Sequence, residues 1–247
     1  MNPISIYKPS PSLLDKQIIL VTGAGDGIGR HAAKTYASLG ATVLLMGRTV
    51  GKLEMVYDEI INRNHPEPAI LPIDLSKLGM ENLTELSNQI FVNYGRLDSL
   101  VHNAAVLGTR VPVEYSDTVE WESVMQINFN GAVLLTRTLL PLLRKSSSAS
   151  LVFTSSSVGK KPRAYWGAYC VSKYAIEGFA LLLADELKST SKVRVNVVNP
   201  GATRTKMRAT AYPNEDPLTV KTPEDLMKLY VYLVDPNNLD HGLTFNG

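Results

Sequence analysis

A serine, a tyrosine and a lysine between residues 151 and 173 are the best candidates for proton-transfer chemistry in this chain. Tyr169 and Lys173 are four residues apart in a segment with a helical pattern, so their side chains are expected one turn apart on one face. The lysine ammonium can then favour the ionised form of the phenol. Ser156 precedes Tyr169 by 13 residues and follows a short apolar run, so it can face the same space.

The elements that must position these residues alternate along the chain. Short runs that are apolar at consecutive positions, typical of parallel strands covered on both faces, are separated by helical patterns. We therefore expect an α/β fold: a Rossmann-type, doubly wound, mostly parallel seven-stranded sheet with helices on both faces. Residues 1–15 contain three prolines and predict a surface tail, and 16–247 predict one domain. The predicted strands are 18–21, 42–46, 69–73, 97–101, 150–154, 193–198 and 243–245; the predicted helices are 27–39, 50–63, 76–94, 117–144, 169–188 and 223–234.

A glycine-rich turn, VTGAGDGIGR, follows the first predicted strand and opens a helix. Glycine lets the backbone approach a ligand closely, and the N–H groups at a helix N-terminus attract a pyrophosphate. The context of a first βαβ unit favours nucleotide binding over a plain tight turn.

The end of the second predicted strand bears on the choice of cofactor. A fold that selects NAD usually places an acid there, whereas an arginine accommodates the 2′-phosphate of NADP. This chain has no carboxylate before Glu54 and offers Arg48, with Thr49 as a hydroxyl donor. NADP(H) is therefore expected rather than NAD(H), although Arg48 can also be read as a solvated loop residue.

Six motifs in one order resemble the short-chain dehydrogenase/reductase family from about Gln17 onward. They are the TGxxxGxG-like turn at 22–29, Asp74-Leu75, the HNAA segment at 102–105 in place of NNAG, Asn128, Ser156 with the YxxxK pair Tyr169 and Lys173, and the Pro200-Gly201 segment. The phrases SSSVG, RAYWGAY and NPGATRTKMRA are similar to a bacterial subgroup, the YciK-like oxidoreductases. Asp26 departs from the many NADP-binding relatives that have arginine there.

The resemblance implies hydride transfer between nicotinamide and a carbonyl or alcohol substrate. Tyr169 is the implied acid/base, Lys173 its activator and ribose ligand, Ser156 the group that holds the substrate oxygen, and Asn128 the anchor of a water path to Lys173. The implied cofactor contacts are Gly23, Gly25, Asp26, Gly27, Ile28, Gly29, Arg48, Asp74, Leu75, Asn103, Ala104, Ala105, Tyr169, Lys173, Pro200, Gly201, Thr203 and Thr205. The resemblance also implies a homodimer or homotetramer. Compared with the family, the sequence ends early at Gly247, so a C-terminal segment that lines the pocket is expected to be missing.

Other features have two readings. Two basic clusters, Lys160, Lys161 and Arg163 and then Arg204, Lys206 and Arg208, are expected at the pocket mouth, either solvated and neutralising cofactor phosphates or attracting anionic substrates. Residues 203–221 are the expected substrate lid. Apolar positions at 121, 124, 125 and 134 and at 176, 179, 182 and 183 can serve the core or a dimer interface.

Composition excludes several classes of protein. A net charge of +2 gives no nucleic-acid footprint, and no apolar run is long enough to predict a membrane span. The single cysteine, Cys170, permits no internal disulfide and reads as a buried thiol, which favours a cytoplasmic setting. The four histidines lack metal-ligand spacing, so no metal is expected. The main competing function is a non-catalytic NADP(H)-binding or redox-sensing protein.

Overall fold

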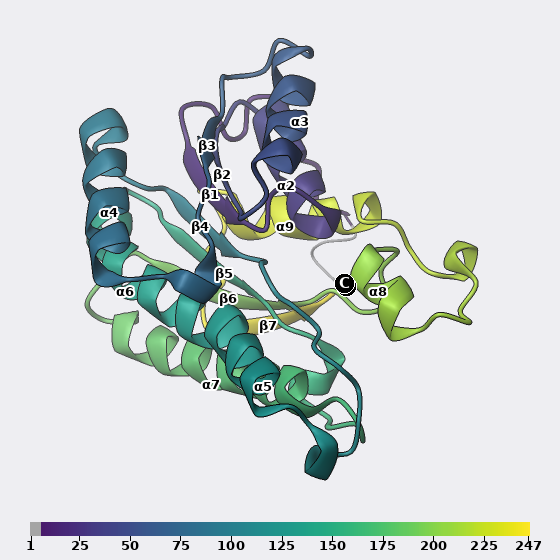
Figure 1. Ribbon diagram of the computed structural model, residues 1–247. Coiled ribbons are helices and arrows are strands. Elements are labelled where there is room, and N and C mark those ends of the chain that lie inside the picture. The colour runs from purple at the N-terminus through teal and green to yellow at the C-terminus, as the bar shows by residue number, and fades with distance from the viewer. Residues whose placement is uncertain (1–5) are drawn as a thin grey trace.

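Seven parallel strands form the centre of the molecule in the computed structural model, which describes residues 6–247. The sheet order is β3-β2-β1-β4-β5-β6-β7 (Figure 1). The strands are β1 (Ile18–Thr22), β2 (Thr42–Met46), β3 (Ala69–Leu71), β4 (Ser99–His102), β5 (Ser150–Thr154), β6 (Arg194–Asn199) and β7 (Leu243–Asn246). This confirms the expected Rossmann-type sheet, and every pairing is parallel.

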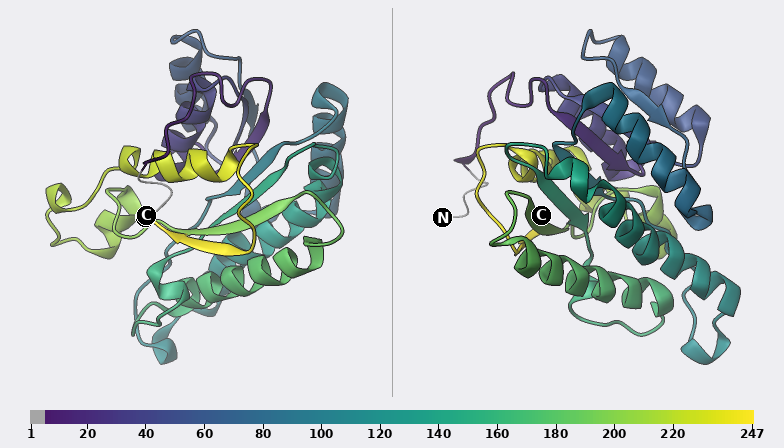
Figure 2. Two further views of the ribbon diagram at one scale, coloured as in Figure 1. Left: turned by 180° about the vertical axis from the view of Figure 1, so that it is seen from behind. Right: turned by 90° about the vertical axis from the view of Figure 1, so that its left-hand side faces the viewer.

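Helices cover both faces of the sheet, as the two views of Figure 2 show. One face packs against α2 (Gly27–Ser38), α3 (Val50–Ile61) and α9 (Met227–Val234), through a core that includes Tyr36, Leu53 and Tyr230. The other face packs against α4 (Met80–Tyr94), α6 (Gly131–Leu143) and α7 (Gly167–Leu187). The sheet is buried on both sides, which explains why its strands are apolar at consecutive positions.

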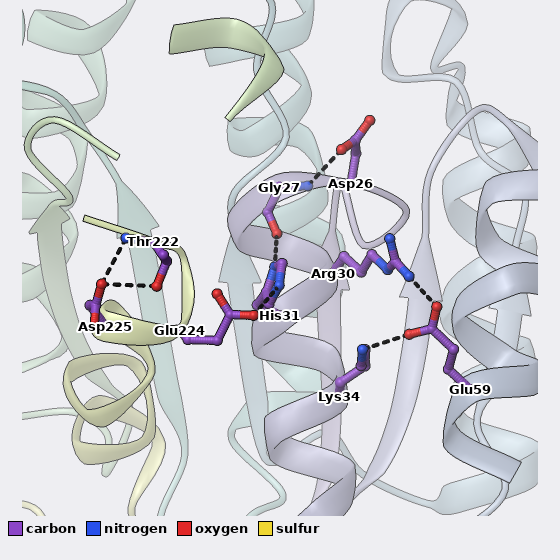
Figure 3. A network of polar contacts seen from close by, with 9 residues as sticks. All are labelled: Asp26, Gly27, Arg30, His31, Lys34, Glu59, Thr222, Glu224 and Asp225. Carbon is purple, nitrogen blue, oxygen red and sulfur yellow. Dashed lines mark hydrogen bonds and ion pairs between the residues drawn. The ribbon is translucent and has the colours of Figure 1, made fainter. Parts of the chain in front are cut away.

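Polar contacts join the helices on the first face (Figure 3). Arg30 and Lys34 of α2 both pair with Glu59 of α3, the lysine at 2.6 Å. His31 of α2 reaches Glu224, which lies in the turn before α9, at 2.7 Å. These contacts hold α2 against α3 and the turn before α9, and the N-terminus of α2 faces a cavity at the carboxyl ends of the strands.

The predicted helix over 117–144 is wrong as a single α-helix. Residues Thr118–Met125 form α5, Gln126–Asn130 form one π-helical turn, and α6 follows. The predicted helix over 76–94 likewise begins late, because Leu75–Lys77 form a separate 3-10 turn. A π-turn adds a residue between hydrogen-bonded positions, and such turns are common at functional sites. Periodicity alone does not reveal either break.

The predicted tail and the expected lid both contain structure that the sequence patterns did not indicate. The first five residues of the predicted tail lie outside the described residues, but Leu14 is fully buried and Tyr7 donates a hydrogen bond to Asp235 at 2.8 Å. The expected lid contains a short helix, α8 (Lys206–Ala211), begun by the hydroxyl of Thr205. Within residues 6–247, no helix is both long and apolar enough to cross a bilayer.

Candidate active site

A cavity of about 390 Å³ opens over the carboxyl ends of the strands, where the strand order reverses between β1 and β4. Ligands of doubly wound sheets bind at such a switch point. All of the site residues expected from the sequence line this cavity except Gly29 and Asn128. The lining ones are Gly23, Gly25, Asp26, Gly27, Ile28, Arg48, Asp74, Leu75, Asn103, Ala104, Ala105, Ser156, Tyr169, Lys173, Pro200, Gly201, Thr203 and Thr205.

Ser156, Tyr169 and Lys173 meet at the inner wall of the cavity. Ser156 follows β5, while the other two lie in the first turns of α7. The Lys173 ammonium lies 5.6 Å from the centre of the Tyr169 ring and donates to the Thr154 carbonyl at 2.8 Å. Ammonium groups have three donors, so this bond leaves capacity for a ligand.

Burial sets the protonation of this group of residues. It raises the pKa of Tyr169 to about 12, although the hydrogen bond with Ser156 acts in the opposite direction. Burial also lowers the pKa of Lys173 to about 8, against the attraction of the Glu177 carboxylate. In the chain by itself, desolvation therefore dominates the pKa of Tyr169, and only the Ser156 hydrogen bond acts against it. Tyr169 is a neutral hydroxyl at pH 7, the form that can donate a proton.

Asn128 lies behind the cavity wall, inside the π-turn, and is almost fully buried. Its Oδ1 accepts from the Val106 N–H at 2.8 Å, and its Nδ2 donates to the Val106 carbonyl at 2.9 Å. Nδ2 also donates to the Ser172 hydroxyl at 3.1 Å. Asn128 thus clamps the loop after β4 to α7, one residue away from Lys173.

The glycine turn brings the start of α2 close to β1. At Gly29 an added Cβ would lie 2.3 Å from the Gly23 carbonyl oxygen, so only glycine allows this approach. Gly23 has a φ of +68°, and its missing side chain makes room for Ala104 after β4. The result is bare backbone and a helix N-terminus facing the cavity, which suits a pyrophosphate.

Asp26 is the N-cap of α2 rather than a free carboxylate. It accepts from the Gly27 N–H at 2.8 Å and from Lys52 at 2.6 Å, and Lys206 lies 3.5 Å away. Burial raises its pKa, but the bonds from Lys52 and Gly27 outweigh this, and the pKa falls below its usual range. The negative charge that departs from the NADP-binding pattern is therefore neutralised by neighbouring lysines.

The end of β2 presents positive charge to the cavity. Arg48 and Thr49 are exposed and line it, and Thr49 is the N-cap of α3 without a side-chain capping bond. Opposite, Asp74 accepts from the Ser76 hydroxyl and N–H, which together with nearby Arg48 hold the pKa of Asp74 below its usual range. A guanidinium, a free hydroxyl and a helix N-terminus form a donor set suited to a phosphate.

The HNAA segment divides between cavity and core. The N–H groups of Asn103 and Ala104 both donate to the Thr22 hydroxyl at 3.0 Å, tying β4 to β1 beside the glycine turn. His102 instead points into the core, where its Nε2 lies 2.9 Å from the Thr136 hydroxyl and burial lowers its pKa to about 3. The substitution at 102 therefore lies away from the cavity.

After β6, the Pro200-Gly201 turn closes the cavity. Thr203 is buried and its hydroxyl donates to the Pro200 carbonyl, while the Thr205 hydroxyl accepts from the Arg208 N–H at 3.1 Å. Thr205 also lies against Gly27. Both threonines thus already have structural partners beside the glycine turn.

Several lining residues were missed by the sequence patterns. Trp166 and Tyr212 form an aromatic wall, with ring centres 5.9 Å apart, although they are 46 residues apart in the chain. Lys52, Met207 and Leu107 also line the cavity. Trp166 and Met207 lie within the phrases RAYWGAY and NPGATRTKMRA, but no motif marks Tyr212, Lys52 or Leu107, which reach the cavity only through the fold. Cys170 is buried, with its thiol 3.1 Å from the Val158 carbonyl. Among the described residues no three His, Cys, Asp or Glu side chains gather as metal ligands would.

Comparison with known proteins agrees with this geometry. The family model for short chain dehydrogenases matches residues 17–216. The chain is 50% identical to the uncharacterized oxidoreductase YciK of Escherichia coli over 241 residues, covering 97% of this chain and 95% of that protein.

Solved structures are equally similar. A short chain dehydrogenase from Shigella flexneri complexed with NADP has a TM-score of 0.93 and 50% identity, covering 96% of this chain and 99% of the other. One from Escherichia coli complexed with NADPH gives the same four values. The resemblance inferred from the motifs is confirmed: this chain belongs to the short-chain dehydrogenase/reductase family and is an oxidoreductase.

Proposed function

We propose that this chain is an NADP(H)-dependent oxidoreductase that interconverts a carbonyl compound and its alcohol. The observation that carries the proposal is the meeting of Ser156, Tyr169 and Lys173 in the same cavity as the glycine turn and Arg48. Bound NADP(H) would supply or accept the hydride at the substrate carbon. The residues of the chain then have to hold the substrate oxygen and move one proton.

The cofactor would be held along the cavity by groups with a matching chemistry. The N-terminus of α2 suits the pyrophosphate, and Arg48, Thr49 and the start of α3 suit the 2′-phosphate. The spare donors of Lys173 suit the nicotinamide ribose. The preference for NADP over NAD is supported by the exposed Arg48 and by the two related structures that contain NADP and NADPH.

Tyr169 would act as the general acid in reduction. Its neutral hydroxyl can pass a proton to the substrate oxygen as the hydride reaches the carbon, which leaves an alcohol and a phenolate. The buried Lys173 ammonium stabilises that phenolate, and Ser156 holds the same oxygen. In oxidation the proton moves in the opposite direction. A pKa near 8 lets Lys173 exchange protons close to neutral pH.

A non-catalytic NADP(H) sensor would have no need to keep these three side chains in one cavity. Calorimetric titration with NADP⁺ and NAD⁺, followed by a panel of carbonyl compounds with NADPH, separates the two functions. Tighter binding of NADP⁺ and NADPH consumption with at least one carbonyl are expected. Binding without turnover across a broad panel would favour the sensor.

We also propose that the chain forms a homodimer through α7. Val171, Tyr174, Leu181 and Leu182 on this helix are between 40% and 57% exposed, whereas Ile176 is buried. Of the positions on α7 expected to serve the core or an interface, Ile176 and Leu183 are buried, whereas Leu182 is left on the surface. Light scattering on the purified chain tests it, and a monomer at micromolar concentration would contradict it.

A further inference from the structure

The charges at the cavity mouth are not equivalent. Of the basic residues expected there, Lys206 pairs with Asp26, and Arg208 pairs with Glu215, its Nε lying 2.7 Å from Oε2. Arg204 donates to the carbonyls of Pro217 and Val220. These three cations already have partners within the chain.

Arg110 and Arg163 differ from them. Both are exposed, and neither forms an ion pair with any carboxylate of residues 6–247. Glu120, an acid that contacts the same loop as Arg110, is already bonded to the Thr109 N–H and hydroxyl, each at 3.0 Å. The positive charges of Arg110 and Arg163 are thus left without a paired carboxylate.

Both guanidinium groups gather around the aromatic wall. Arg110 lies 5.6 Å from the centre of the Trp166 ring and 5.8 Å from that of Tyr212. Arg163 lies 5.9 Å from the Trp166 ring and donates to the Tyr212 hydroxyl. Stacking on an aromatic ring holds a guanidinium in place while its N–H groups stay available. The two cations therefore converge from separate loops on Trp166 and Tyr212, which line the cavity.

The wall beneath them is apolar and adjoins the catalytic tyrosine. The Trp166 ring lies 5.8 Å from the Tyr169 ring and is 9% exposed. Tyr165, just before it, has a φ of +71°, a costly conformation for a bulky residue that turns the chain at this point. Leu107, Met207 and Ala211 complete the apolar lining.

We propose that the substrate is an acidic carbonyl compound with a flat apolar body. Its carbonyl would lie at Ser156 and Tyr169, its body along Trp166, and its carboxylate or phosphate between Arg110 and Arg163. The proposal depends on the proposed reductase function. Arg110 and Arg163 lie on the loops after β4 and β5. The groups suited to the cofactor phosphates, the glycine turn and the start of α3, follow β1 and β2 instead, so the two arginines are assigned to the substrate and not to the cofactor.

Matched probes test the assignment. NADPH consumption is measured with 4-formylbenzoate, its neutral methyl ester and 4-formylphenyl phosphate, in wild type, Arg110→Gln, Arg163→Gln and the double variant. Lys161→Gln, which removes a nearby exposed charge, is the control. We expect kcat/KM for either acid to exceed that for the ester by about tenfold, since two exposed charge-assisted contacts are involved.

The double variant should abolish this preference and leave the Kd of NADPH within about twofold, whereas Lys161→Gln should keep the preference. Equal rates for acid and ester in wild type, or an undiminished preference in the double variant, would overturn the inference. If none of the three probes turned over, calorimetry with 4-formylbenzoate would decide the inference, whereas only the absence of turnover across the broad carbonyl panel would count against the reductase function. Binding that is weakened in the double variant supports the anion site, and equal binding in both proteins overturns it.

Discussion

Replacing Asn128 by alanine is expected to loosen the wall of the cavity. The amide makes three hydrogen bonds, two to the Val106 backbone and one to Ser172, and the side chain is 3% exposed. At about 1 kcal/mol for each bond, with an added penalty for unpaired Val106 groups, we expect a loss of about 2–4 kcal/mol. In a chain of this size the Tm should fall by roughly 5–15 °C. The affinity for NADPH should also fall, because Val106 lines the cavity.

Thermal unfolding followed by circular dichroism measures this effect. Asn130→Ala is the matched control, because Asn130 lies on the same π-turn but is exposed, with only a side-chain contact to Gln126. It should change the stability by less than about 0.5 kcal/mol. If Asn128→Ala kept the Tm of the control while losing turnover, the clamp would be refuted. The proton path implied by the family resemblance would then be the better explanation.

Three further substitutions test other parts of the site. Arg48→Ala should weaken NADP⁺ binding about tenfold and leave NAD⁺ binding unchanged in calorimetry, because only NADP⁺ carries the 2′-phosphate; equal losses would remove Arg48 from that role. Glu177→Gln removes the carboxylate that raises the pKa of Lys173. Because the reduction rate should fall as the Lys173 ammonium is lost near pH 8, this alkaline fall should move to lower pH in the variant. A fall at the same or a higher pH would contradict this. Gly29→Ala puts a Cβ 2.3 Å from a backbone oxygen and should cost roughly 2–4 kcal/mol in chemical denaturation. Gly51→Ala in α3, where an added Cβ meets only the Glu54 carboxylate at 3.9 Å, is the control and should not destabilise the fold; similar effects would count against the close helix approach.

Much of the fold could be predicted because local signals agree with the global arrangement. The strands at 42–46 and 150–154 were expected with their observed bounds, since buried parallel strands are short apolar runs. The site could be predicted from the sequence for a related reason, because its motifs follow strand ends that meet at one edge of the sheet. Ser156, Tyr169 and Lys173 are such residues.

The remainder depends on contacts between distant segments. The π-turn around Asn128 is held by bonds to a loop 22 residues away, and α8 begins at a threonine cap within a stretch without apolar periodicity. Nothing near Arg110 in the sequence shows that it will lie beside Trp166 and Tyr212. The raised pKa of Tyr169 in the chain without its cofactor has the same origin, since desolvation depends on the whole surrounding fold.

The most direct test of the catalytic account compares the wild type with Tyr169→Phe. The substitution removes the hydroxyl that would donate the proton and leaves the ring against Trp166. NADPH consumption with a carbonyl that the wild type reduces should fall by about 10²–10⁴-fold, while the Kd of NADPH stays within a few-fold. Turnover retained within about tenfold, with NADPH still bound, would contradict the assignment of Tyr169 as the proton donor.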